Sequence, residues 1–410
     1  MVLLTHPFGN ANVRALLAAL QSNDSLVKFV TTVGWSKQSH PGLPPSIREA
    51  LRRNYELPPD KIEIHPFRES VRLLASRFRW QPLIEHEVGW ASIDRVWQNL
   101  DRTTARRLRG GKYSAARCVY AYEDCAEQTF LTAGELGLKR IYDLPIAYWQ
   151  TAVALLRQEV ERYPDWEPTL GATRDSQEKL ARKSREVELA DLVICPSTFV
   201  LESLPREIRQ QKRCLVVPFG TPVCDPELAA SSRSEAGPLR VLFAGALSQR
   251  KGLADVFAAI KRINSQQVEL VVMGSLIKPL NWYRQRLPNF VYERPRPHDD
   301  VLKLMQSCDI FVLPSIVEGR ALVQQEAMAC GLPVIVTRNA GADDLIVDGE
   351  TGFLVPIRAP EAIAETISWF LGNRDRLAGM RIAARNRASQ RSWQAYGDGI
   401  VKALHQLISQ

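Results

Sequence analysis

Short apolar runs alternate with helical patterns along the second half of the chain, and this alternation constrains the fold more than any other sequence feature. Six runs are predicted as strands, at residues 241–245, 268–274, 290–293, 309–315, 333–337 and 352–356. Helical patterns separate several of them, over residues 252–263, 298–306 and 322–330. Strands that are apolar throughout, with helices between them, are typical of a parallel sheet covered on both faces. We therefore predict a doubly wound α/β domain.

The first half repeats this pattern with longer insertions. Strands are predicted at residues 2–6, 28–33, 62–65, 116–122, 139–142, 191–196 and 214–218, and helices at 12–21, 125–137 and 147–163. Apolar periodicity lapses over residues 221–238, which are rich in Pro, Ser and Ala. We predict a first domain over 1–222, a linker over 223–238, a second domain over 239–390 and a final helix over 391–410. Two such domains leave a ligand cleft between the carboxyl ends of their strands.

The composition agrees with a folded protein of two domains. Hydrophobic residues make up 45% and charged residues 24% of the 410 residues, which excludes collagen-like, coiled-coil and disordered classes. No run of eighteen apolar residues is present, the length a membrane-spanning helix needs. The seven cysteines form no C-x-x-C pair and predict free thiols in a reducing compartment. The opening Met1-Val-Leu-Leu-Thr-His has no basic leader, so we expect a cytoplasmic protein.

The net charge of +8 is concentrated in one stretch, because residues 68–117 hold eleven Arg or Lys and five acids. Two interpretations stay open: a solvated basic face, or a surface for anionic membrane lipid or an anionic acceptor. We do not expect nucleic acid as a partner, since no nucleic-acid-binding module is visible. The tryptophans of this stretch, Trp80, Trp90 and Trp97, are predicted to be helix core residues.

The strongest chemical signal is the loop between the strand that ends at Ser315 and the helix that begins near Leu322. Glu318 lies in this loop, and Glu326 lies a turn further along the helix. Uncapped N–H groups at the start of a helix suit a phosphate or diphosphate, and a carboxylate can accept two hydrogen bonds from vicinal hydroxyls of a sugar or ribose. The alternative is an ordinary strand–loop–helix connection whose two glutamates face solvent.

The second signal is Gly245-Ala-Leu-Ser-Gln-Arg250-Lys251-Gly252, which also follows a strand and opens a helix. Two cations at the carboxyl end of a strand could neutralise a diphosphate in the same cleft. The stretch lacks the spacing of a Walker loop. A solvated pair of cations is the alternative.

Other motifs are weaker or absent. In the loop Thr5-His6-Pro-Phe-Gly9-Asn10-Ala-Asn12, Gly9 would let the backbone approach a ligand closely, whereas Asn12 is typical of a helix cap. The sequence has no D-x-D pair, no H-E-x-x-H motif and no metal-ligand spacing among its six histidines, so we predict no metal site. It also has neither a G-x-S-x-G elbow nor a G-x-G-x-x-G fingerprint.

In combination these residues resemble the retaining, nucleotide-sugar-dependent glycosyltransferases of the GT-B fold, family 4. The E-x7-E pair of Glu318 and Glu326 matches the signature of that family. Four stretches match as well: Asp309-Ile-Phe-Val-Leu-Pro-Ser, Arg250-Lys-Gly, Glu326-Ala-Met-Ala-Cys-Gly-Leu-Pro-Val-Ile-Val-Thr and Asp348-Gly-Glu-Thr-Gly-Phe-Leu-Val. The specific match covers about residues 239–375, and the first half matches more loosely through residues 190–197 and 217–220.

The resemblance implies a donor site in the second domain, an acceptor site in the first, and a last helix that crosses back onto the first domain. Lys251, helped by Arg250, would contact the diphosphate. Glu318 would hydrogen-bond the donor sugar, and Glu326 would bind the ribose hydroxyls. The other residues that would border the donor, several through their backbone, are Gly9, Gly245, Gly274, Arg294, Gly319, Arg320, Ala321, Leu322 and Val323.

The chain departs from the family pattern at three places. Ala246 stands where relatives often have Arg, and Arg320-Ala321 stands where Phe-Gly is usual. The histidine that relatives often carry near the reacting centre is not evident. Asp143, at a strand end of the first domain, is our candidate to stand in for it, and Tyr122-Glu123-Asp124, at another strand end of that domain, is the other.

The activity implied is transfer of a hexose from a nucleoside diphosphate sugar, with UDP or GDP as the carrier, to a hydroxyl of a glycan or lipid-linked acceptor. Cations and helix amides would stabilise the charge on the leaving group without a metal or other cofactor. No carboxylate nucleophile is evident, so we favour a front-face path in which the departing phosphate takes the acceptor's proton. The alternatives are a non-catalytic nucleotide-sugar-binding subunit of a glycan assembly system, and a GT-B epimerase or phosphorylase.

Overall fold

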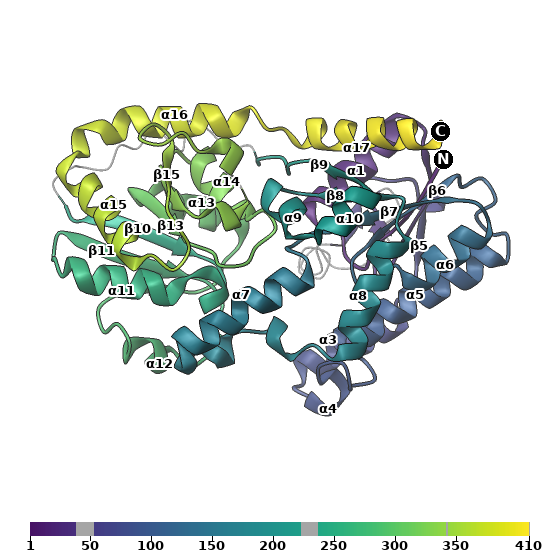
Figure 1. The fold of residues 1–410 in the computed structure, drawn as a ribbon, viewed down its shortest axis with the longest axis horizontal. Coiled ribbons are helices and arrows are strands. Elements are labelled where there is room, and N and C mark those ends of the chain that lie inside the picture. The colour runs from purple at the N-terminus through teal and green to yellow at the C-terminus, as the bar shows by residue number, and fades with distance from the viewer. Residues whose placement is uncertain (38–52, 223–236, 342, 410) are drawn as a thin grey trace.

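The computed structural model describes residues 1–37, 53–222, 237–341 and 343–409. Two open sheets lie side by side, one in each half of the chain, with helices on both faces (Figure 1). Every strand pairing within these two sheets is parallel. The structure therefore confirms the predicted α/β class with two doubly wound domains.

The first sheet has seven strands in the order β5-β2-β1-β6-β7-β8-β9. Its strands are β1 (Val2–Thr5), β2 (Leu26–Thr31), β5 (Ile62–Ile64), β6 (Cys118–Tyr122), β7 (Lys139–Asp143), β8 (Leu192–Cys195) and β9 (Arg213–Val216). A short separate pair consists of β3 (Trp35–Ser36) and β4 (Asn54–Tyr55). The order changes direction at β1, which pairs with both β2 and β6, so the loops after β1 and β6 diverge and open a crevice there.

The second sheet has six strands in the order β12-β11-β10-β13-β14-β15. Its strands are β10 (Leu239–Ala244), β11 (Val268–Met273), β12 (Val291–Glu293), β13 (Ile310–Leu313), β14 (Val334–Val336) and β15 (Gly352–Leu354). The direction of the order changes at β10, which pairs with β11 in register Val241 to Leu270 and with β13 in register Val241 to Ile310. The loops after β10 and β13 therefore form the ligand crevice of this sheet.

Helices connect the strands in both halves. The first half has α1 (Ala11–Ser22), α3 (Phe67–Arg77), α4 (Gln81–Ile84), α5 (Ile93–Arg109), α6 (Glu127–Glu135), α7 (Trp149–Arg162), α8 (Gln177–Leu189), α9 (Thr198–Ser203) and α10 (Arg206–Gln211). The second half has α11 (Leu253–Ile263), α12 (Leu280–Arg284), α13 (His298–Gln306), α14 (Leu322–Ala329), α15 (Pro360–Gly372), α16 (Leu377–Ser389) and α17 (Trp393–Ile408).

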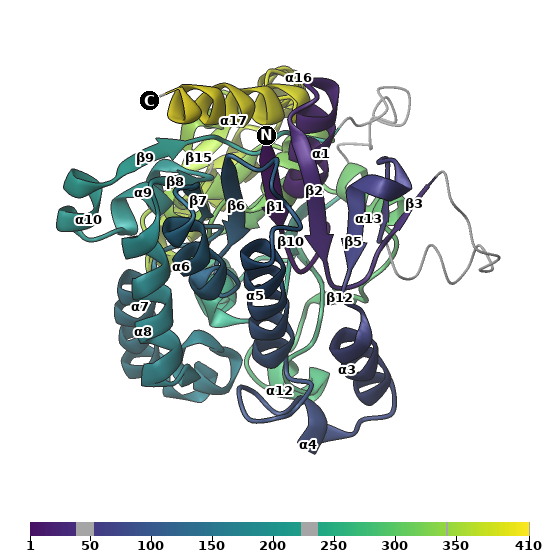
Figure 2. The same cartoon turned by 90° about the vertical axis from the view of Figure 1, so that its right-hand side faces the viewer.

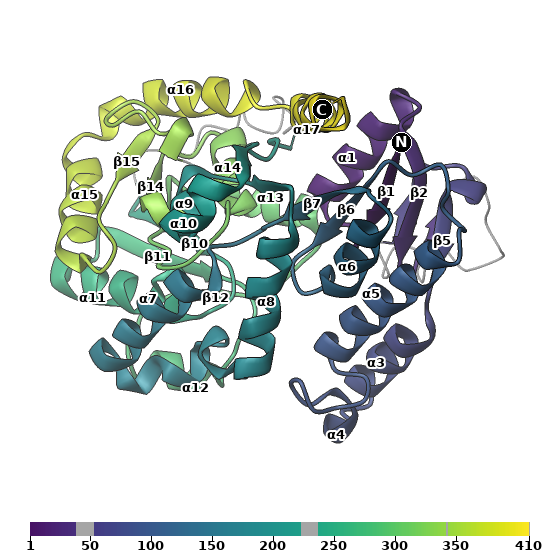
Figure 3. The same cartoon turned by 45° about the vertical axis from the view of Figure 1, so that its right-hand side comes forward.

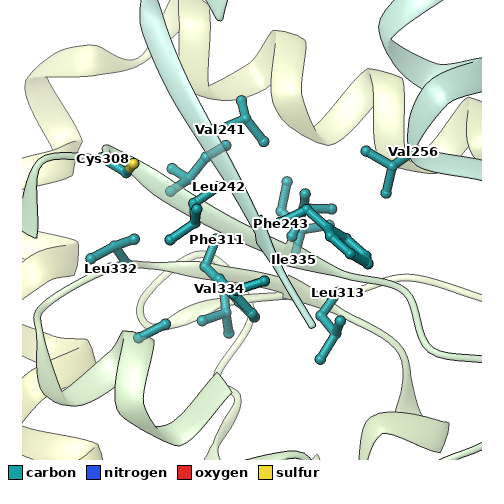
Figure 4. Packing of buried hydrophobic residues seen from close by; sticks show 14 of the residues in the cluster. Val241, Leu242, Phe243, Val256, Cys308, Phe311, Leu313, Leu332, Val334 and Ile335 are labelled. Carbon is teal, nitrogen blue, oxygen red and sulfur yellow. The ribbon is translucent and has the colours of Figure 1, made fainter. Parts of the chain in front are cut away.

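The core of the second domain forms where its central strands meet the helices on both faces. Figure 4 shows side chains of β10, β13 and β14 gathered there, including Phe243, Phe311 and Ile335, with Val256 of α11 beside them. These four side chains are fully buried. Each contributes about 1.5–3 kcal/mol relative to an exposed position, which holds the ends of β10 and β13 at a fixed spacing beneath the crevice.

The last helix, α17, packs on α1 of the first domain (Figures 1 and 2). Its buried side chains Ile400 and Leu404 join a core with Leu16 and Leu20 of α1. Ser392, the residue before α17, caps this helix, because its hydroxyl accepts a hydrogen bond from the Ala395 amide. The chain thus returns from α16 of the second domain to complete the first domain.

A second crossing involves α7 and the 3-10 helix η2 (Pro164–Thr169), which lie against the second domain beside α11 and α12 (Figure 3). Trp166 belongs to the hydrophobic core of the second domain. Its ring packs at 4.9 to 5.9 Å between centroids against Phe257, Trp282 and Tyr283. No sequence feature indicated this crossing, because the segment is separated from its partners by the rest of the first domain.

The predicted linker, residues 223–238, lies outside the described residues except for its last two positions, and so does Cys224. The predicted domain limits therefore stay a prediction. The other six cysteines are free thiols, five of them buried. In the part of the chain that the structure covers, no helix is both long and apolar enough to cross a membrane.

Candidate functional site

A cavity of about 560 Å³ lies between the two domains at the carboxyl ends of their strands. The first domain contributes Asn10, Ala11, Asn12, Tyr122, Pro145 and Phe219, and the second contributes Gly245, Ala246, Arg250, Lys251, Glu318, Arg320, Ala321, Leu322 and Val323. Eight of these residues were predicted as site residues from the sequence. The structure thus brings the two strongest sequence signals together in one cavity.

The turn after β10 positions the two cations. It forms a 3-10 helix, η5 (Gln249–Lys251), that ends at Gly252 with φ of 77°. A Cβ at Gly252 would collide with the carbonyl oxygen of Pro314 after β13, so only glycine allows this approach. The Arg250 carbonyl also accepts a hydrogen bond from the Ile316 amide at 2.9 Å. The loop with the cations is thereby fixed against the loop that carries Glu318.

Glu318 forms ion pairs with both cations. Its Oε2 atom lies 3.2 Å from Arg250 Nη1 and is in contact with Lys251 Nζ. Burial raises the pKa of Glu318, but Lys251 and Arg250 outweigh this effect, and the pKa lies below its ordinary value. Burial lowers the pKa of Lys251, and Arg250 adds to that, against the attraction of Glu318. Two cations facing one carboxylate leave a net positive charge, which suits a diphosphate.

The start of α14 forms the floor of the cavity, and no side chain caps this helix. Leu322 and Val323, its first two residues, line the cavity, so its positive dipole end is directed there. The amide of Ala321, which we expected to meet phosphate or sugar, donates instead to the Ala340 carbonyl at 3.0 Å. That expectation was wrong for Ala321, because the loop before α14 is held by this backbone hydrogen bond.

The guanidinium of Arg320 is directed away from the donor side, although the residue lines the cavity. Its side chain is 1% exposed and donates to Gln325 Oε1 at 2.7 Å and to Asp344 Oδ1 at 2.6 Å. Arg391, just before α17, lies 3.0 Å from the same Asp344 carboxylate. Its buried partners hold the guanidinium between the loop and the chain crossing, and the donor-binding role of Arg320 stays a prediction.

Glu326, the predicted ribose ligand, lies outside the residues that line the cavity. Its side chain is 18% exposed and its Oε1 atom lies 3.8 Å from His298 Nδ1 at the start of α13. Burial raises the pKa of Glu326, and His298 opposes this. The role of Glu326 stays a prediction.

Three further predicted donor residues, Gly274, Arg294 and Gly9, do not line the cavity. Gly274 packs on the backbone of Gly245 at the end of the neighbouring strand. Arg294 lines a separate surface depression of about 480 Å³ with Arg296 and Lys303. Gly9 faces the ring of Tyr55, with which a Cβ would collide, and it does not line the cavity.

The first domain contributes Asn12 and Tyr122 to the cavity, and also Asn10 and Phe219, which sequence reasoning did not assign to a site. Asn10 is the residue before α1, and Asn12 lies within that helix and lines the cavity, so the prediction of Asn12 as a cap was wrong. Tyr122 and Phe219 also face the cavity. The position of Tyr122 at the end of β6 was the one available signal, since the carboxyl ends of parallel strands share an edge.

Of the two predicted candidates for the missing histidine, Tyr122 of Tyr122-Glu123-Asp124 lines the cavity, whereas Glu123, Asp124 and Asp143 do not. Asp143 is 2% exposed, and its Oδ2 atom has no hydrogen-bond partner in the described chain. Burial raises the pKa of Asp143 to about 7. Asp124 is paired with Arg182 at 2.9 Å, and Glu123 with Lys183 at 3.2 Å, so these carboxylates stabilise α8 against the end of β6.

The two domains touch at the Glu318 loop. Gly319 packs directly on the carbonyl of Pro145, where a Cβ would collide, and its own carbonyl accepts a hydrogen bond from Ser197 Oγ at 2.6 Å. Ile316 and Val317 pack on Leu156 of α7 in a core shared by both halves. The loop that carries Glu318 is therefore held from both sides of the cleft.

Comparisons with known proteins agree with this geometry. Residues 225–387 match the family model of glycosyl transferases group 1. A D-inositol 3-phosphate glycosyltransferase of Corynebacterium aurimucosum is 25% identical over 320 residues, covering 72% of this chain and 74% of that protein. A GDP-mannose-dependent alpha-mannosyltransferase of Mycobacterium tuberculosis is 31% identical over 223 residues, covering 52% of this chain and 56% of that protein.

Solved structures share the whole fold. Sucrose-phosphate synthase from Thermosynechococcus elongatus superimposes with a TM-score of 0.69 at 17% identity, over 100% of this chain and 99% of that one. HepE of Anabaena, solved in complex with UDP, superimposes with a TM-score of 0.62 at 18% identity, over 99% of each chain. These likenesses show that the chain has the fold of these proteins, with two open α/β domains on either side of a cleft. Within the chain, residues 225–387 belong to the glycosyl transferases group 1.

Proposed function

We propose that the protein is a retaining hexosyltransferase that moves a hexose from a nucleoside diphosphate sugar to a hydroxyl of a glycan or lipid-linked acceptor. The observation that carries the proposal is the meeting of Arg250, Lys251 and Glu318 with the uncapped start of α14 in one cavity. The UDP complex of HepE and the GDP-mannose dependence in the name of the mycobacterial relative support a nucleoside diphosphate sugar as donor. We also propose a cytoplasmic location.

The diphosphate would lie against Arg250 and Lys251 and the start of α14. Negative charge grows on the leaving phosphate as the glycosidic bond breaks, and fixed cations and a helix dipole stabilise that charge without reorganisation. Glu318 would then accept a hydrogen bond from a sugar hydroxyl, while Lys251 exchanges part of its contact with Glu318 for phosphate oxygens. These groups supply the charge compensation for which other enzymes use a metal ion, so we propose a metal-independent reaction.

The lining of the cavity supports a front-face path. Glu318 is the one carboxylate among the described residues that line it, and two cations hold its Oε2 atom. A carboxylate held in this way is a poor nucleophile. The acceptor hydroxyl would attack from the side of the departing phosphate, whose oxygen takes the proton, and the anomeric configuration would be retained. Asn10, Asn12 and Tyr122 would face the acceptor from the first domain.

The test begins with a thermal-shift screen of UDP, GDP, ADP and dTDP and their common sugars. A ligand that binds only the native state raises its stability, so micromolar affinity is measurable. Turnover of the selected donor is then followed as released nucleoside diphosphate with a panel of glycan and glycolipid acceptors, with and without a chelator. We expect acceptor-dependent release and a product of retained configuration by NMR. Donor binding without release for any acceptor would favour a non-catalytic binding subunit, and inversion would reject the mechanism.

A further inference from the structure

An unusual number of large apolar side chains are exposed around α3 and α4. Half of the exposed large hydrophobic residues in the described chain lie within residues 64–93: Ile64, Phe67, Leu74, Phe78, Trp80, Val88, Trp90 and Ile93. Phe67 is 73% and Val88 is 72% exposed. The sequence-based expectation that Trp80 and Trp90 belong to a helix core was wrong, since they are 54% and 43% exposed. A cluster of this kind marks an interaction surface.

The apolar residues of α3 form one outward stripe. Phe67, Leu74 and Phe78 follow at spacings of seven and four, which places them on one face of a helix. Glu69, on the opposite face, and Ala75, beside the stripe, are both fully buried. Two aromatic contacts extend the stripe, because Phe67 packs on Trp90 at 5.8 Å and Phe78 on Trp80 at 5.5 Å. We call Phe67, Leu74, Phe78, Trp80 and Trp90 the α3–α4 face.

Arginines surround this face, and three of the five acids within residues 68–117 are turned inward, whereas Glu85 is exposed. Arg77, Arg79, Arg95 and Arg102 are exposed. Glu69, Asp94 and Asp101 are at most 4% exposed. Within the described residues none of these four arginines forms an ion pair, and the sequence excess of cations therefore becomes a basic outer surface.

Arg68 joins the arginines to the aromatic residues. Its guanidinium lies 4.6 Å from the centre of the Trp90 ring, and burial together with Arg95 and Arg102 lowers the pKa of Arg68. The guanidinium groups of Arg68, Arg95 and Arg102 repel one another, so an anion beside them would stabilise them. The exposed Trp90 ring next to Arg68 suits the interface between water and lipid.

We propose that the α3–α4 face docks onto the surface of an anionic lipid bilayer. Tryptophan and phenylalanine side chains would enter the interfacial region, and the flanking arginines would contact lipid phosphates. A second copy of the chain fits less well, since a symmetric contact would place the same unpaired arginines opposite each other. The face lies at the end of the first domain opposite α17 (Figures 1 and 3), so docking leaves the α16–α17 side free.

The test is flotation of the full chain with vesicles of phosphatidylcholine alone and of phosphatidylcholine mixed with phosphatidylglycerol. We expect the protein to float with the anionic vesicles only. If the arginines alone bind the lipid, 1 M salt should abolish flotation. If the apolar stripe is also inserted, part of the flotation should remain at 1 M salt. Either result supports docking by this face provided the variants below respond. No flotation with anionic vesicles at low salt overturns the proposal.

Matched variants assign the binding to this face. Leu74→Ser on α3 is compared with Ile382→Ser on α16, because these side chains are 54% and 59% exposed. Arg77→Glu is compared with Arg206→Glu, another exposed arginine. Each arginine near an anionic surface is worth about fivefold in affinity, so we expect Arg77→Glu to weaken vesicle binding by at least about fivefold. Equal effects in both members of a pair, or tighter binding to a DNA duplex than to anionic vesicles, would reject a membrane face.

Each variant is also measured for its melting temperature and for binding of the donor nucleotide found by thermal shift. We expect both to stay at the wild-type values, since these side chains lie outside the cavity between the domains. A protein that binds vesicles but no nucleotide would contradict the proposed transferase activity and leave the docking face intact, so the two proposals fail separately.

Discussion

The side-chain amide of Gln249 donates to the carboxylate of Glu159 at 2.6 Å, and this hydrogen bond joins the two halves of the chain in the protein interior. Both side chains are fully buried. Gln249 also donates to Asp255 at 2.9 Å and accepts from the Ala254 amide at 2.8 Å. Because Gln249 begins the turn that continues with Arg250 and Lys251, α7 of the first half fixes a loop that lines the cavity between the domains.

Replacing Gln249 with Leu should therefore affect stability and donor binding together. The change removes the hydrogen-bond donor that the buried carboxylates of Glu159 and Asp255 share. This loss lowers the free energy of unfolding by about 1–3 kcal/mol. We expect this loss in urea unfolding and a weaker affinity for the donor nucleotide. Gln210→Leu, at an exposed position of α10, is the control. Lower stability with unchanged nucleotide affinity would show that the turn keeps its shape without α7.

Lys251→Ala should slow transfer more than it weakens donor binding. The cation would be most effective when charge accumulates on the leaving phosphate, and loss of such a group costs about 10²–10³ in kcat. Released nucleoside diphosphate measures the rate, and calorimetry measures the affinity. Lys261→Ala, on the exposed side of α11, should change neither. A rate equal to that of the wild type would remove Lys251 from the mechanism.

Glu326→Ala tests the ribose assignment with a pair of nucleotides. If the carboxylate accepts hydrogen bonds from the ribose, the wild type should bind the ribonucleotide about tenfold more tightly than its 2′-deoxy analogue, and the variant should not distinguish them. Glu365→Ala, an exposed residue of α15, serves as the matched control. Discrimination that persists in the Glu326 variant would place the ribose elsewhere.

Asp143 should make stability depend on pH in the direction opposite to a salt-bridged acid. Burial raises its folded-state pKa from 3.8 to about 7, so between these values the folded state holds a proton that the unfolded state has lost. The contribution of Asp143 to the stability of the folded state is therefore largest below pH 3.8, the pKa in the unfolded state. It decreases as the pH rises to about 7, the pKa in the folded state. Asp143→Asn should gain about 2 kcal/mol relative to the wild type between pH 5 and 7.

Chemical unfolding at several pH values measures that difference. A constant difference between wild type and Asp143→Asn would mean that the carboxyl ionises normally in the folded protein. Turnover of the same variant tests the other role, because a group that only fills its buried site should leave kcat unchanged, whereas a base that acts on the acceptor should not.

The strands of both sheets and about half of the residues that line the cavity could be predicted for one physical reason. Continuous apolar runs define parallel strands, and parallel strands bring the loops after them to one edge, so Lys251 and Glu318 had to be near each other. The direction of Arg320 was not predictable, because Asp344, its partner, lies far away in sequence and is brought near by the fold. The exposure of Trp80 and Trp90 was likewise not predictable, because an apolar residue in a helical pattern does not reveal whether it faces the core or the solvent.

Most residues that the first domain contributes to the cavity could not be predicted from the sequence, for a similar reason. Asn12 and Phe219 face the cavity only because α17 and the Glu318 loop set how the domains are joined. No local pattern encodes that orientation, whereas the end of a strand, such as Tyr122, can be located from its own run of residues.

The place of Trp166 in the second core has a consequence for the order in which the protein is made. Phe257 and Tyr283, against which it packs, are synthesised about a hundred residues later, and at 5–20 residues per second the nascent chain waits roughly 5–20 s for them. During that interval η2 and its Trp166 have no core to enter. The segment of the first half that carries Trp166 therefore cannot complete its packing on the ribosome until the second half has emerged.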